Sequence, residues 1–212
     1  MFIELIDLLR CIRAHDETWL VASFNTVSHR FVEEAKLGCP ACKAEYWIRG
    51  GVADFSGEVI LPECEDERRA ASHRREELAT RAGAYLEATE SGATVVLGGL
   101  WAYAAQELSE MAEIKVIAIN APAEVKESET VGLLSVGSEI PLAAGSVLGV
   151  AVDAWFPAKI VESAVRVVRP GGRVVGPAAT KAPSELSILA HDDKYWVAQK
   201  APEVVTISRA SR

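Results

Sequence analysis

The chain has 212 residues, half of them hydrophobic and a quarter charged, which is enough apolar material for one large packed domain or two small ones. Its net charge of −8 argues against non-specific nucleic-acid binding, because that binding needs a basic surface. The most apolar run, residues 140–156, is broken by Pro141 and Asp153, and the N-terminus lacks a secretory cleavage pattern, so we expect no membrane span and a cytoplasmic location.

Residues 1–60 are predicted to form a small module rich in strands. Apolar residues crowd residues 2–9, which predicts a short helix. Two strands at 19–24 and 30–35 are expected to flank a polar link, and a third at 44–49 turns at Gly50-Gly51. A module of this size buries little surface, so a metal that cross-links it is physically reasonable.

Residues 61–91 are predicted to be a helical connector. The stretch is highly charged, but Leu78, Ala82, Tyr85 and Leu86 recur at helical spacing. We therefore expect one helix over about residues 63–90, packed on the domain that follows.

Residues 92–212 alternate between strand and helix patterns, which is typical of an α/β fold with a mostly parallel sheet. A closing hairpin is expected at the C-terminal end. The predicted strands are 94–98, 115–119, 131–136, 147–152, 173–176, 195–199 and 204–208, and the predicted helices are 101–112, 157–168 and 183–190.

Cys39-Pro-Ala-Cys42 is the strongest sign of a metal site. Two thiolates at this spacing on a tight turn can bind one tetrahedral zinc. Cys11 follows the first predicted helix, and His15 lies four residues later, which would complete a Cys₃His set of structural type. A redox role for Cys39 and Cys42 is the alternative, but it normally requires a helix that starts directly after a strand.

The fourth ligand has alternatives. His15 stands beside Asp16 and Glu17 and would then be an ordinary exposed histidine. His29 is the reserve candidate, followed by Cys64 in the charged connector. The remaining histidines, His73 and His191, are interpreted as surface residues.

The N-terminal module resembles a known family over the first quarter of the chain. It is similar to the small zinc-ribbon activators of methyltransferases. Two features carry the likeness: a leucine-rich start that ends at Cys11, and the run Cys39-Pro-Ala-Cys42 followed by Tyr46-Trp-Ile-Arg49-Gly. The resemblance implies a structural zinc and an apolar face that docks on a methyltransferase. The second cysteine that this family carries after the first helix is absent here, and Trp47 and Gly50 replace its proline and aspartate.

Residues 75–212 resemble the class I S-adenosylmethionine-dependent methyltransferases, which have a Rossmann-like fold. Two segments carry the likeness: residues 138–146, and the run from Arg166 through Pro170-Gly171-Gly172 to Val175. The second motif is architectural, since it turns the chain from helix into strand.

The cofactor motif of that family is altered in this chain. Gly98 and Gly99 stand at the expected glycine loop, but Leu100 and Ala102 occupy positions where the family has glycine. Asn120 takes the place of the acid that binds the ribose, and Glu139 lies next to the position of the adenine-binding acid. The resemblance thus places any bound S-adenosylmethionine against Gly98, Gly99 and Asn120, without the usual carboxylates.

Asp153 follows a predicted strand at a position where α/β folds place functional groups. Capping of the helix that follows Pro157 would explain this residue equally well.

Two functions of different classes follow from these observations. The first is a non-catalytic scaffold with a structural zinc ribbon, which pairs with an active methyltransferase or with a second copy of itself. The second is an active methyltransferase that its own ribbon stabilises in cis. No catalytic residue is assigned in either case.

Overall fold

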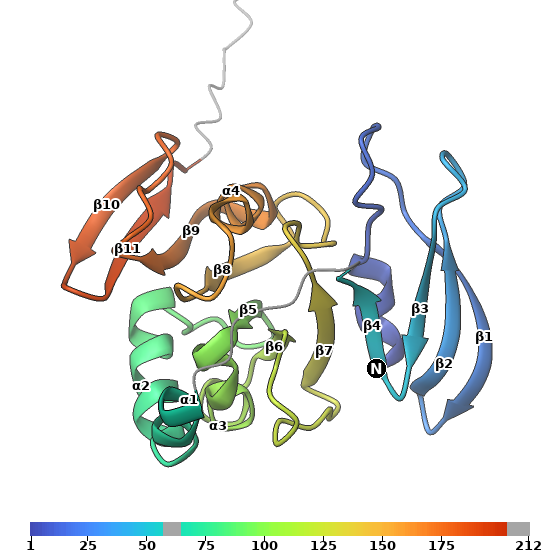
Figure 1. The fold of residues 1–212 in the computed structure, drawn as a ribbon, viewed down its shortest axis with the longest axis horizontal. Helices are drawn as coiled ribbons and strands as arrows, with labels where there is room; N and C mark the ends of the chain where they lie inside the picture. Colours follow the sequence, from blue (N-terminus) through green and yellow to red (C-terminus); the bar gives the residue numbers. More distant parts are fainter. Residues whose placement is uncertain (57–64, 203–212) are drawn as a thin grey trace, which may run out of the picture.

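The computed structural model describes residues 1–56 and 65–202, apart from the side chains of residues 65, 66 and 68. One sheet of eleven strands runs through this part of the chain, in the order β1-β2-β3-β4-β7-β6-β5-β8-β9-β11-β10 (Figure 1). Its central strands, from β4 to β9, are all parallel, and both flanks are antiparallel. The sheet is therefore mixed, with a parallel centre.

The N-terminal module is an antiparallel meander beside a short 3₁₀ helix, η1 (Ile3–Leu8). Its strands are β1 (Val21–Ser28), β2 (Phe31–Gly38), β3 (Glu45–Arg49) and β4 (Val52–Phe55). The predicted link at residues 25–28 is part of β1, and the turn falls at His29-Arg30, both with positive φ. The strand β4 was missed because four residues leave almost no pattern in the sequence.

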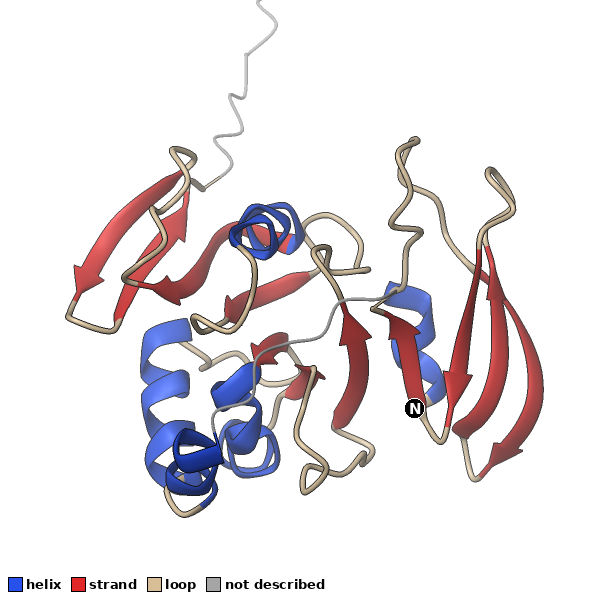
Figure 2. Ribbon diagram, viewed as in Figure 1, coloured by secondary structure: helices blue, strands red, loops and turns tan. Residues whose placement is uncertain are grey.

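The predicted connector helix is two helices, α1 (Glu65–Ser72) and α2 (Arg75–Leu86), so the expectation of one continuous helix was wrong. The chain breaks its helical path at His73-Arg74. Both helices lie against the α/β part of the molecule, as Figure 2 shows.

The α/β part follows the predicted order as far as β9. Its elements are β5 (Thr94–Gly98), η2 (Gly99–Ala104), α3 (Ala105–Ala112), β6 (Lys115–Ile119), β7 (Val131–Val136), β8 (Val147–Ala151), α4 (Ala158–Val167) and β9 (Val168–Pro177). The predicted helix 101–112 thus begins with a 3₁₀ turn, and the predicted strand 173–176 begins earlier.

The C-terminal prediction was wrong at one element. Residues expected to form a helix at 183–190 form the strand β10 (Leu186–His191), which pairs with β11 (Tyr195–Lys200). The strand β11 also pairs with β9, so the closing hairpin is β10–β11. The strand predicted at 204–208 lies outside the described residues.

The parallel sheet is covered on both faces. Alternate residues of β5 point to opposite sides: Val95 and Leu97 pack with α2 and α3, whereas Val96 packs with η1 and α4. The core around η1 continues into the N-terminal module, where Val32, Leu37 and Ile48 are buried. None of the helices in the described ranges has the length and hydrophobicity needed to span a bilayer.

The N-terminal module joins the α/β part through the sheet itself. Residues 52–55 of β4 pair in parallel with residues 133–136 of β7. On the η1 face, the Leu5 side chain fills the space beside Gly132, where a Cβ would clash with it. These contacts dock the module on the second half of the chain.

Candidate metal centre and candidate ligand cavity

Four potential metal ligands converge at one end of the N-terminal module. Cys11 and His15 lie in the segment between η1 and β1, and Cys39 and Cys42 lie in the turn between β2 and β3. Their ligand atoms all lie within 4.8 Å of one another. The structure thus brings together the four residues that the sequence predicted. His29 stands apart at the β1–β2 turn, and Cys64 lies outside the described residues.

The distances fit a tetrahedral ion. The sulfur atoms of Cys11 and Cys42 are 3.7 Å apart, and Cys39 Sγ is 3.4 Å from His15 Nε2. A zinc ion with Zn–S bonds of about 2.3 Å in a tetrahedron would place two sulfurs about 3.8 Å apart. Both distances are therefore compatible with one metal ion bound between the four residues.

The histidine ring is already oriented for ligation. His15 Nδ1 is 2.7 Å from the Asp16 carbonyl oxygen, which can only accept a hydrogen bond. Nδ1 is then the protonated nitrogen, and the lone pair of Nε2 faces Cys39. A backbone carbonyl that fixes the outer nitrogen is a common partner of metal-binding histidines.

The electrostatics favour thiolate at Cys39. Burial acts to raise the pKa of this thiol, but the backbone N–H groups of Cys42 and Ala41 outweigh it and lower the pKa to about 7. The pKa of Cys11 is raised, chiefly by burial, although the hydroxyl of Tyr46 acts against that shift. Deprotonated sulfur is the form that binds a metal.

The redox alternative requires a different local structure. Cys39 and Cys42 lie in a turn between two antiparallel strands, and Lys43 closes it with a positive φ and an N–H that donates to the Cys39 carbonyl. The strand-to-helix junction expected of a redox motif is therefore not the setting of these two residues.

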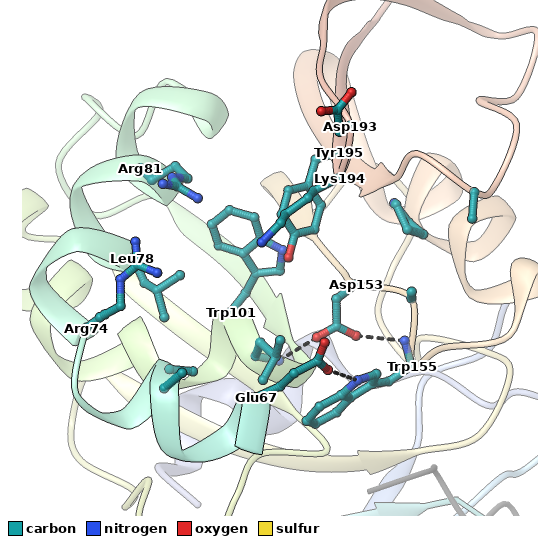
Figure 3. A pocket seen from close by; sticks show the side chains of 16 residues that line it. Glu67, Arg74, Leu78, Arg81, Trp101, Asp153, Trp155, Asp193, Lys194 and Tyr195 are labelled. Atoms are coloured by element: carbon teal, nitrogen blue, oxygen red, sulfur yellow. Dashed lines mark hydrogen bonds between the residues drawn. The ribbon is translucent and has the colours of Figure 1, made fainter. Parts of the chain in front are cut away.

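A second site lies at the carboxyl ends of the parallel strands. From β5 the chain continues to β6 and β7 on one side, and it then returns to β8 on the other side of β5. The strand order therefore reverses between β5 and β8, which makes this position a topological switch point. Such points are where open α/β sheets bind ligands. A cavity of about 400 Å³ opens here. Its lining includes Leu100, Trp101, Asp153, Trp155, Glu67, Arg74, Leu78, Arg81, Asp193, Lys194 and Tyr195 (Figure 3).

Asp153 is the buried carboxyl of this cavity, with 3% of its surface exposed. Its two oxygens accept hydrogen bonds from the backbone N–H groups of Leu100, at 2.6 Å, and Trp155, at 3.0 Å. Burial raises the pKa of Asp153 to about 6, and nearby Glu67 adds to the rise, whereas the two N–H groups act against it. Asp153 thus ties the end of β5 to the end of β8.

The predicted cofactor glycines make this tie possible. Gly99 has a φ of +63°, and a Cβ there would collide with the Asp153 carboxylate. A Cβ at Gly98 would lie 2.8 Å from the Phe156 ring. Both glycines thus provide space for packed protein groups, and neither lines the cavity. That they bind a cofactor stays a prediction.

Asn120 also has protein partners. Its amide Nδ2 donates to the Val136 carbonyl oxygen at 2.8 Å, and its Oδ1 accepts from the Val136 N–H at 2.7 Å. The side chain therefore clamps the end of β7 from a left-handed backbone position, with φ of 49°. A ribose contact by Asn120 stays a prediction and would compete with this pair of hydrogen bonds.

Sequence reasoning found Asp153 but missed most of the cavity. Trp155 and Glu67 carried no motif, and the wrong helix at 183–190 hid the β10–β11 turn that supplies Lys194. Tyr195 begins the strand that was predicted at 195–199, without a sign that it faces a cavity. The switch-point rule was the available signal, since it marks every residue that follows β5 or β8.

The ionisation of Asp153 is expected to reduce stability as the pH rises. The pKa of Asp153 in the folded protein, about 6, lies above its ordinary value of 3.8, so protonated Asp153 stabilises the fold. This stabilisation is complete below about pH 3.8 and is lost as the pH rises through about 6. Between about pH 4 and about pH 7 the loss should be about 2 kcal/mol. Urea unfolding of wild type and Asp153→Asn at both pH values measures it. An equal difference between the two proteins at both would contradict the assignment.

No protein-family model matches the sequence, and no curated protein matches it. Among solved structures, the chain is similar to one from the complex of the Haloferax volcanii Trm112 methyltransferase activator with a candidate methyltransferase. The identity is 16%, over 66% of this chain and 95% of that one, with a TM-score of 0.48.

Two further solved structures are similar. A candidate S-adenosyl-L-methionine-dependent methyltransferase from Methanococcus maripaludis is 10% identical over 70% of this chain and 100% of its own, with a TM-score of 0.46. One from Methanosarcina mazei is 11% identical over 55% and 96%, with a TM-score of 0.42. These structural neighbours of the chain are S-adenosylmethionine-dependent methyltransferases, and the likeness concerns the fold alone.

Proposed function

We propose that this chain is a non-catalytic, methyltransferase-like scaffold that carries its own structural zinc ribbon. The observation that supports this proposal most is that the protein's own groups fill the positions where a cofactor is expected to bind. The space above Gly99 holds the Asp153 carboxylate, and the amide of Asn120 is paired with Val136. A nucleotide-like cofactor needs close backbone approach and free polar groups at these positions.

The ribbon supports the same proposal. Cys11, His15, Cys39 and Cys42 form a closed set of four donors, which suits a structural zinc and leaves no ligand position for a substrate. The module's docking surface is used within the chain, through β4 on β7 and Leu5 on Gly132. A protein partner, either a methyltransferase or a second copy, would then meet another face. The outer strand β1, with Val21 and Phe24 exposed, is available for this.

The scaffold proposal predicts no measurable affinity for S-adenosylmethionine at micromolar concentration. Loss of the charge-assisted hydrogen bonds normally made to the ribose would weaken binding by about tenfold or more for each bond. Isothermal titration calorimetry on the purified protein tests this, with zinc content measured on the same sample. Light scattering on that sample reports self-association.

A saturable isotherm at micromolar concentration would restore the alternative, an active S-adenosylmethionine-dependent methyltransferase stabilised in cis by its ribbon. The observation that favours this alternative is the cavity at the β5–β8 switch point, beside the end of the predicted glycine loop. Methyl transfer would then have to be sought with candidate acceptors.

A further inference from the structure

The cavity at the switch point has two acidic side chains at one end. Asp153 lies at its floor, and Glu67 of α1 is close enough to raise the pKa of Asp153. Glu67 accepts a hydrogen bond from Trp155 Nε1 at 3.3 Å, and Figure 3 shows this group beside Asp153. Among the residues whose side chains the structure describes, neither carboxylate has an ion-pair partner. Two neighbouring acids without a countercharge attract a cation.

Aromatic side chains surround these acids. Trp155, Trp101 and Tyr195 all line the cavity, and the rings of Trp101 and Tyr195 lie 4.9 Å apart. Aromatic faces attract cations, and alkylated ammonium groups in particular. The acidic end is therefore suited to an organic ammonium group and less suited to a bare metal ion, which would need more oxygen ligands.

Basic side chains lie at the other end of the cavity (Figure 3). Arg81 reaches it from α2, and Lys194 from the β10–β11 turn. Arg81 shares Glu77 with Arg74, whereas Lys194 has no ion-pair partner in the part of the chain that the structure describes. Asp193 is exposed beside Lys194 and also lines the cavity. Arg81 and Lys194 outnumber this one acid, so the cavity has an acidic end at Asp153 and Glu67 and a net basic rim.

We propose that this cavity binds a small zwitterion, an alkylated amine that carries a carboxylate. Its ammonium group lies against Asp153 and Glu67 among the aromatic rings. Its carboxylate faces Lys194 and Arg81. The volume of about 400 Å³ is within the range of small-molecule sites. This site is additional to the scaffold role and does not depend on it.

Glycine betaine is the probe that tests this proposal. Its isostere 3,3-dimethylbutanoate has the same shape and carboxylate, but carbon replaces the charged nitrogen. Calorimetry, and the fluorescence of Trp101 and Trp155, should show saturable binding of glycine betaine at millimolar concentration and none of the isostere. Choline, which lacks the carboxylate, should bind more weakly than glycine betaine.

Variants locate the site. Trp155→Leu should weaken glycine betaine binding by about five- to thirtyfold through loss of the aromatic face. Glu67→Gln keeps the acceptor for Trp155 and removes one charge, so binding should weaken by about three- to tenfold. Glu76→Gln makes the same change on the exposed side of α2, outside the cavity lining, and should leave affinity unchanged. Because both Gln variants change exposed residues, neither depends on refolding of the floor around Asp153.

Three results would overturn the proposal. One is equal binding of glycine betaine and 3,3-dimethylbutanoate, which would indicate an anion site made by the basic rim. Another is the absence of glycine betaine binding. The third is an equal loss of affinity in Glu67→Gln and Glu76→Gln, which would indicate a non-specific charge effect.

Discussion

Replacing Cys39 with serine is expected to abolish metal binding and to destabilise the chain by about 4 kcal/mol or more, equal to about 8–16 °C in melting temperature. Cys39 is buried, with 2% of its surface exposed, and its sulfur lies beside His15. The loop that carries Cys11 and His15 is held to the β2–β3 turn mainly through these ligand atoms. Elemental analysis and differential scanning calorimetry measure the two effects.

Cys64→Ser is the matched control, because it makes the same chemical change at a cysteine that is not one of the four proposed ligands. It should retain one zinc per chain and the wild-type melting temperature. Zinc retained in full by Cys39→Ser would refute the proposed ligand set. Zinc lost from Cys64→Ser would instead make Cys64 a ligand.

Gly99→Ala should destabilise the protein by about 3–5 kcal/mol, the second large effect. The backbone φ of +63° disfavours any side chain, and the new Cβ would displace the Asp153 carboxylate. Asp153 is held by two backbone N–H groups and is almost fully buried, so it has no nearby alternative position. Its displacement would leave the Leu100 N–H and a carboxyl group without partners. Chemical unfolding measures the loss.

Gly92→Ala separates the effect of backbone strain from the effect of the clash with Asp153. Gly92 has a φ of +77°, and nothing lies within 4 Å of the position that a Cβ would take, so only the backbone strain applies. Its expected loss is about 1 kcal/mol. Equal losses in the two variants would show that the contact with Asp153 contributes nothing.

The convergence of the four candidate metal ligands could be predicted because its signal is local. The CxxC turn places two of them, and a cysteine and a histidine four residues apart supply the others from one loop. The parallel strands were predictable for a similar reason: runs such as residues 95–98 and 147–151 are buried on both faces and carry no polar side chain.

The element that failed at residues 183–190 depends on a partner outside its own segment. Residues 183–190 contain leucine, alanine and glutamate, which favour helix, yet Leu186–His191 is a strand because β11 offers it a ladder of hydrogen bonds. The cavity could not be read from the sequence either. Its walls come from α1, α2, η2, the ends of β9 and β11, and the loops beside them, which meet only in the folded chain.

The pairing of β4 with β7 also affects how the protein is made. Val52 lies opposite Leu133, about 80 residues later in the chain. During synthesis the N-terminal strands emerge first, and the free edge of β4 stays open until β7 has left the ribosome. Such long-range parallel pairing forms slowly and leaves strand edges prone to aggregation. Early metal loading of the nascent segment would hold its first strands together during that interval.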